Sequence, residues 1–155
     1  MKTRDYILLA LSLFLIIFFA VSSKGQNTQK EETVFVAASL QPFVFDFIKE
    51  ARKRGFDPLD RIISLDSIKF KNDNRTLGLY ANNNVYINPF LNIDSHIIKV
   101  VVFHELFHAV YKMPHCHKKC NHLMGAYKPE NFTFSLYYND EIWQTVLDIE
   151  FNRIK

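Results

Sequence analysis

The sequence has 155 residues, of which 48% are hydrophobic and 15% aromatic, which indicates a foldable globular chain and excludes a disordered or low-complexity one. This length allows one compact domain of ordinary size once a targeting segment is subtracted. The formal net charge is only +3 and no basic run with interleaved aromatic residues follows the first residues, so nucleic acid is not an expected partner.

The first 25 residues have the pattern of a secretory signal peptide. Basic Lys2 and Arg4 precede an apolar stretch over residues 6–21, and small residues follow it. An uncleaved N-terminal membrane anchor is the alternative interpretation of residues 1–25. In either case we expect an exported protein, secreted, periplasmic or anchored, that contacts a membrane only through this segment if it is uncleaved.

The next segments predict a linker and the start of the folded domain. Residues 26–32 are polar and predict a linker, so the domain is expected over 33–155. Residues 34–37 form an apolar run typical of a strand. Apolar residues then recur at helical spacing after a proline that suits a first turn, which predicts a helix over 42–54.

Strands are expected in the middle of the chain. The β-branched and aromatic residues of 61–70 predict a strand. Residues 77–81 and 85–87 flank three consecutive asparagines, which tolerate the left-handed dihedral angles of hairpin turns. This arrangement predicts a β-hairpin.

Two further helices are expected, separated by a long irregular segment over residues 114–133. The first runs over 96–113, with Asp94 or Ser95 as its cap and Pro114 as its stop. The second is capped by Asn139 or Asp140. Its expected apolar contacts are made by Ile142, Trp143, Val146, Leu147, Ile149 and Ile154.

The helix expected over 96–113 carries the chemically most informative motif. Its residues are apolar around almost the whole circumference, so it is expected to be buried. Within it lie His104, Glu105 and His108, whose burial costs several kcal/mol unless a partner satisfies them. Residues four apart share one helix face, so His104 and His108 can bind one Zn²⁺. Glu105 is the expected general base toward a zinc-activated water.

A catalytic zinc ion takes three protein ligands and keeps one open position, so the chain must return to this helix after His108. His115, directly after Pro114, is the expected third ligand. Three residues compete with His115 for that role: His117, His122 and Glu141.

Here the sequence resembles the zincin superfamily of metallopeptidases, in its metzincin-like form. In that group a third His follows the His-Glu-x-x-His helix and precedes a Met-containing turn, as His115 and Met124 do here. The metzincin pattern has Gly three residues after the second His and the third His six residues after it. This chain has Tyr111 and then His115 seven residues after His108, which is similar to small metallopeptidases of bacterial exported proteins.

The resemblance implies a fold and a set of roles. The fold would be α+β and zincin-like: a small mixed sheet with an edge hairpin, a buried active-site helix, a Met-turn-like loop and a C-terminal helix. His104, His108 and His115 would be the metal ligands, Glu105 the base, and Met124 the hydrophobic floor beneath the metal. An extended peptide would lie along the edge strand.

Cys116 and Cys120 are the only cysteines. In an exported protein a short disulfide is the favoured interpretation, but a second, structural metal ion or free thiols are alternatives. The pair partly resembles the cysteines of archaemetzincins, which hold such a second ion.

The sequence therefore predicts a zinc-dependent peptidase, specifically a metalloendopeptidase, acting on a peptide or protein substrate. Two alternatives stay open: an exported zinc-binding domain without catalytic activity, and a membrane-anchored interaction domain whose histidines are packed in the core.

Overall fold

The computed structural model of the protein describes residues 33–73, 76–89, 94–116, 123–125 and 139–154. The chain divides into two units, Met1–Glu31 and Glu32–Lys155, and all described residues belong to the second. Within the described residues no helix is both long enough and apolar enough to cross a membrane.

The sheet is small and mixed. Its order is β1-β2-β4-β3, with parallel pairing of β1 to β2 and of β2 to β4, and antiparallel pairing of β3 to β4. Strand β3 is therefore an edge of the sheet. The bounds are Phe35–Val36 for β1, Ser67–Phe70 for β2, Gly78–Ala81 for β3 and Asn84–Ile87 for β4.

The predicted hairpin is confirmed. Asn82 and Asn83 connect β3 to β4 with φ of 49° and 61°, the left-handed values that a two-residue hairpin turn requires and that asparagine tolerates. In such a hairpin alternate residues pair by hydrogen bonds with the neighbouring strand. Since Ala81 pairs with Asn84 beside the turn, Gly78 and Tyr80 direct their backbone groups away from β4.

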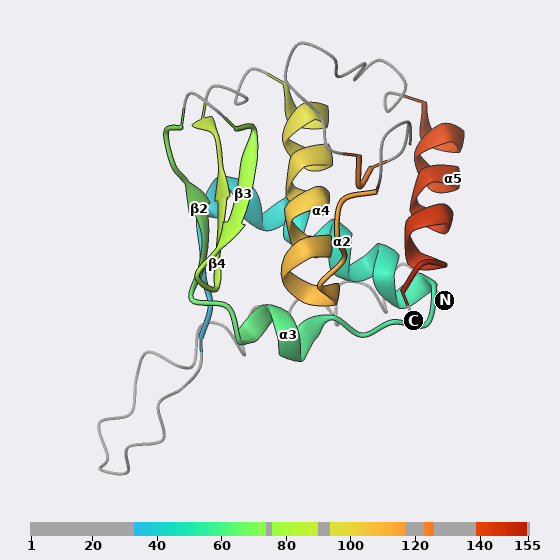
Figure 1. The fold of residues 1–155 in the computed structure, drawn as a ribbon, viewed down its shortest axis with the longest axis horizontal. Helices are drawn as coiled ribbons and strands as arrows, with labels where there is room; N and C mark the ends of the chain where they lie inside the picture. Colours follow the sequence, from blue (N-terminus) through green and yellow to red (C-terminus); the bar gives the residue numbers. More distant parts are fainter. Residues whose placement is uncertain (1–32, 74–75, 90–93, 117–122, 126–138, 155) are drawn as a thin grey trace, which may run out of the picture. The chain divides into compact units, whose positions relative to one another are not determined.

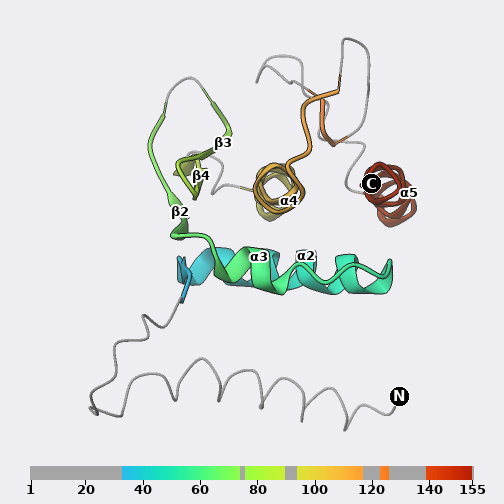
Figure 2. The ribbon, with the colours of Figure 1, turned by 60° about the horizontal axis from the view of Figure 1, so that its bottom comes forward.

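The other described elements are helical. After a short 3₁₀ turn, η2 (Ala38–Leu40), come α2 (Gln41–Lys53), α3 (Leu59–Ile63), α4 (Ser95–Tyr111) and α5 (Asp140–Phe151). Figure 1 shows α4 beside the β3–β4 hairpin. In Figure 2, which looks along α4, this helix lies between the sheet and α5, with α2 crossing below. The central position of α4 explains why so little of it reaches solvent.

The core joins α2, α4 and α5 through aromatic side chains. Phe47 of α2 forms T-shaped pairs with Phe103 and Phe107 of α4, and its ring centroid lies 5.2 Å and 5.3 Å from theirs. Edge-to-face pairs at such distances add to the free energy gained from burial. At the end of α2, the Arg54 guanidinium donates to Asp148 of α5 at 2.7 Å, so a polar contact on the rim also links the two helices.

The predicted strand over 61–70 is wrong in its first part. Residues Leu59–Ile63 form α3, and the strand is confined to Ser67–Phe70. The physical reason lies just upstream: the Asp57 carboxylate accepts the Leu59 N–H at 3.2 Å, and Pro58 at the N-cap starts a helical turn that the β-branched pattern does not reveal.

The final helix is confirmed, with Asn139 as its cap, but two of its expected core contacts are wrong. Ile142 and Ile149 are about two-fifths exposed, whereas Trp143, Val146 and Leu147 are buried. Ile142 and Ile149 lie seven residues apart on one face, which turns away from α4. The predicted α+β class with a small mixed sheet is confirmed.

Candidate metal centre

Helix α4 carries the candidate site and is defined by local signals at both ends. The Asp94 carboxylate accepts the His96 N–H at 2.8 Å and caps the first turn, as predicted. The helix ends at Tyr111, two residues before the predicted end, because Lys112 adopts a left-handed conformation with φ of 55°. This turn redirects the chain so that Met113 and Pro114 lead back along the helix.

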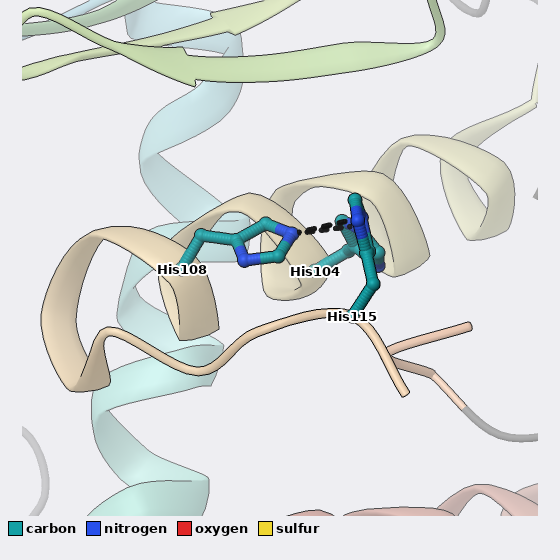
Figure 3. Close-up of side chains that lie close together, drawn as sticks. All are labelled: His104, His108 and His115. Atoms are coloured by element: carbon teal, nitrogen blue, oxygen red, sulfur yellow. Dashed lines mark hydrogen bonds between the residues drawn. The ribbon is translucent and has the colours of Figure 1, made fainter. Parts of the chain in front are cut away.

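Three imidazoles converge at the surface of α4. His104 and His108 come from successive turns of the helix, and His115 comes from the returning segment (Figure 3). Each pair of Nε2 atoms lies 3.0 Å apart. His104 and His108 are partly buried, and His115 is exposed. These three residues could hold a metal ion.

The opposite ring nitrogens fix the tautomers of the two helix histidines. His104 Nδ1 lies 2.7 Å from the Leu123 carbonyl oxygen, and His108 Nδ1 lies 2.5 Å from the Met113 carbonyl oxygen. A carbonyl oxygen only accepts hydrogen bonds, so each Nδ1 must carry a proton and donate. In neutral rings, each Nε2 then presents a lone pair.

Both rings favour the neutral form. Burial lowers the pKa of His104 to about 4, and burial also lowers the pKa of His108. The Nε2 atoms of His104 and His108 therefore face each other with two lone pairs and no proton between them. Such a contact is repulsive unless a cation lies between the lone pairs.

The dimensions of the triad agree with a bound transition-metal ion. Nitrogen ligands about 2.05 Å from a tetrahedral zinc ion lie about 3.3 Å from one another, a few tenths of an ångström more than the observed 3.0 Å. In the described residues no fourth His, Cys, Asp or Glu belongs to this group. The donor set thus consists of three imidazoles, which suits zinc and its neighbours in the first transition row.

Glu105 lies deep beside the triad, only 5% exposed. Its carboxylate accepts the backbone N–H of Tyr80, one of the groups that β3 directs away from β4. Burial raises the pKa of Glu105 to about 8, an effect that this hydrogen bond partly offsets. The edge strand and the motif helix are therefore in direct contact through Glu105.

Met124 is completely buried in a short segment beside the triad. Its carbonyl oxygen accepts the Cys116 N–H at 2.8 Å, so the segment after His115 pairs with the segment around Met124. The residue before it, Leu123, supplies the carbonyl that His104 contacts. Met124 is thus linked to the triad through its backbone neighbours.

The remaining predicted site residues have different positions. Cys116 is disulfide-bonded. Cys120, His117 and His122 lie outside the described residues. Glu141 is exposed in the first turn of α5, where its N–H is bonded to the Asn139 cap, and it does not belong to the histidine group.

Sequence reasoning missed one charged residue near this site, Glu150 of α5. Its carboxylate is fully buried and accepts the Met124 N–H at 2.8 Å. A signal was present: Trp143, Val146 and Leu147 define the buried face of α5, and Glu150 continues their spacing of three and four residues. An acidic residue at such a position requires a specific partner.

No family model, curated protein or solved structure matches this chain.

Proposed function

We propose that this chain is a zinc-dependent peptidase of zincin type that acts outside the cytoplasm. One observation carries the proposal: the Nε2 atoms of His104, His108 and His115 lie 3.0 Å from one another. Three imidazole nitrogens converge in this partly buried site, and two of them have lone pairs that face each other; a divalent cation accounts for this arrangement.

The ligand set supports a catalytic rather than a structural ion. Structural zinc sites use four protein ligands, whereas catalytic sites use three and keep one position open. The described residues contribute three, and the exposure of His115 gives the group access to solvent. Bound zinc would supply a Lewis acid that lowers the pKa of a water molecule and polarises a peptide carbonyl group.

Glu105 is the residue proposed to move the proton. Its carboxylate would take a proton from the attacking water and pass it to the nitrogen of the leaving amine. The Tyr80 N–H holds the carboxylate, and the burial of Glu105 limits competition from bulk solvent. A purely structural metal site would have no use for a buried acid at this position.

The proposed substrate is an extended peptide. In the described part of the chain, β3 pairs with a strand on one side only, and Glu105 connects this strand to α4. An extended peptide can add to such an edge through backbone hydrogen bonds.

The test uses the full chain loaded with Zn²⁺ and a library of quenched fluorescent peptides. We expect Glu105→Gln to keep its zinc stoichiometry and to lose hydrolysis by roughly 10²- to 10⁴-fold. Undiminished hydrolysis in this variant would exclude Glu105 as the base. If the parent binds zinc but cleaves nothing, and its Co²⁺ spectrum shows a closed four-ligand site, the non-catalytic zinc-binding domain is the better description.

A further inference from the structure

The buried carboxylate of Glu150 lies at the end of a chain of hydrogen bonds that leads to the histidine triad. One of its oxygens, Oε2, accepts from the Arg153 guanidinium at 2.6 Å, and the other, Oε1, accepts the Met124 N–H at 2.8 Å. The Glu150 side chain has no exposed area, whereas that of Arg153 is 30% exposed. A buried charge of this kind is costly unless it is paired and hydrogen-bonded, as here.

A single peptide group connects Glu150 to His104. The N–H that Glu150 accepts and the carbonyl that His104 Nδ1 contacts at 2.7 Å both belong to the peptide bond between Leu123 and Met124. That bond is trans and planar, so its N–H and C=O point in opposite directions along one rigid unit. Fixing the N–H end therefore fixes the carbonyl end.

The charge of the Glu150 carboxylate should also strengthen the contact between the Leu123 carbonyl and His104. An amide that donates to a carboxylate is polarised, and its carbonyl oxygen becomes a stronger acceptor. A stronger acceptor at Nδ1 orients the imidazole and raises the basicity of its Nε2 lone pair. Metal-bound histidines commonly have a carboxylate or carbonyl in this position.

His108 provides a contrast within the same site. Its Nδ1 also contacts a carbonyl, that of Met113. The nitrogen of that peptide group belongs to Pro114, however, and therefore carries no hydrogen. No carboxylate can act on His108 through that peptide. Any effect of Glu150 should therefore be selective for His104.

We propose that Glu150 is a positioning residue for His104, acting through the Leu123–Met124 peptide group. The inference rests on the proposed function in one respect, namely that His104 is a metal ligand. It goes further in assigning to α5, a helix distant in sequence from the motif, control over one of the three ligands.

The test compares the full chain with Glu150→Gln and with Glu50→Gln as a matched control. Glu50 is also a buried carboxylate paired with an arginine, Arg54 at 2.8 Å, but it lies on α2 and bonds to no part of the triad or of the segment around Met124 that the structure describes. We expect Glu150→Gln to lower Co²⁺ affinity by about 10- to 100-fold and to change the ligand-field spectrum. Glu50→Gln should keep the parent affinity within about twofold and the parent spectrum.

A second readout separates positioning from general loosening of the fold. In ¹⁵N-edited NMR spectra of the zinc-loaded chain, the His104 Nδ1–H resonance should shift in Glu150→Gln while that of His108 stays in place. Equal shifts of both, or of neither, would overturn the proposal, as would a Glu50→Gln variant that loses as much Co²⁺ affinity.

If Glu150→Gln does not fold, Arg153→Met decides the question, because it keeps the carboxylate but removes the guanidinium that orients it. The same selective shift of His104 is expected, and its absence overturns the proposal. Failure of the parent chain itself to bind Co²⁺ would overturn both this inference and the metal site. Failure of the parent to cleave peptides would overturn the proposed peptidase activity alone.

Discussion

The backbone of Gly78 lies so close to Glu105 that a Cβ on residue 78 would stand 2.7 Å from both Cγ and Oε1 of the glutamate. It would also stand 2.7 Å from a methyl carbon of Val101 on the same helix. Real Cβ atoms do not approach other atoms so closely, so β3 can contact α4 at this point only because residue 78 is glycine.

The first prediction follows from this contact. In Gly78→Ala the added methyl group should displace the Glu105 carboxylate, and a shift of about 1 Å in a catalytic group costs roughly 100-fold in rate. We expect kcat/KM for a cleaved peptide to fall by about that factor while zinc stoichiometry stays at the parent value.

Gly55→Ala is the matched control. Gly55 has φ of 85° and no atom within 4 Å of its added Cβ, so alanine there should cost about 1–2 kcal/mol through backbone strain alone. Its kcat/KM should stay at the parent value. A Gly78→Ala chain with parent kcat/KM would show that the contact has no role in hydrolysis.

The features that sequence predicts well are those set by neighbours along the chain. Short-range patterns in the sequence determine the Asp94 and Asn139 caps, the hairpin turn at Asn82–Asn83 and the burial of α4. His104 and His108 meet because helix geometry alone brings residues four apart together. His115 needs only the left-handed turn at Lys112 to return to them.

What the sequence did not reveal depends on contacts between distant segments. The pairing of β2 with β4 and the bond from Glu150 to the Met124 N–H connect residues separated by loops whose course the local pattern does not specify. The helical start of α3 was hidden for another reason, since Ile62 and Ile63 favour strands and the Asp57–Pro58 cap overrode that preference.

The second prediction concerns ligand identity. Replacing His104, His108 or His115 by alanine should each lower the bound zinc of the purified chain to a small fraction of the parent value, because the remaining two imidazoles cannot complete a three-ligand site. Elemental analysis measures the metal and also identifies it. The informative comparisons are His117→Ala and His122→Ala, which should bind as much zinc as the parent. If His115→Ala keeps its zinc and either His117→Ala or His122→Ala loses it, the histidine replaced in the variant that loses zinc is the third ligand.

The third prediction is a pH dependence of stability in the metal-free chain. The pKa of Glu105 is about 8 in the folded protein against 4.5 for an ordinary Glu, so between these values the folded state holds a proton that the unfolded state has released. The contribution of Glu105 to the free energy of unfolding should therefore fall as pH rises from about 5 to 8, by about 1.4 kcal/mol for each pH unit at most.

Urea unfolding of the parent and of Glu105→Gln, both in chelator, tests this dependence. Glutamine does not titrate, so the decline should be absent from the variant. Burial lowers the pKa of His104 to about 4 and makes stability rise with pH up to about 6.5, but this contribution is common to both chains and cancels in the difference. Parallel pH profiles for the two chains would contradict the buried, protonated state of Glu105.

The fourth prediction is that metal binding stabilises the fold. The three ligands come from α4 and from the segment that follows it, so the site exists only when these are folded together. A ligand that binds the folded state alone adds about 2.7 kcal/mol at a free concentration 100 times its Kd. Removing zinc with a chelator should therefore lower Tm by several degrees, and restoring zinc should reverse the change.

His96→Ala is the matched control for that experiment. His96 lies in the first turn of α4, and alanine at this position keeps the backbone N–H that donates to the Asp94 cap. This variant should show the full zinc-dependent rise in Tm, whereas His104→Ala should show none. An equal rise in both would mean that zinc stabilises the chain at some other place. Since the Tm shift needs no substrate, it tests the metal site even if no cleaved peptide is found.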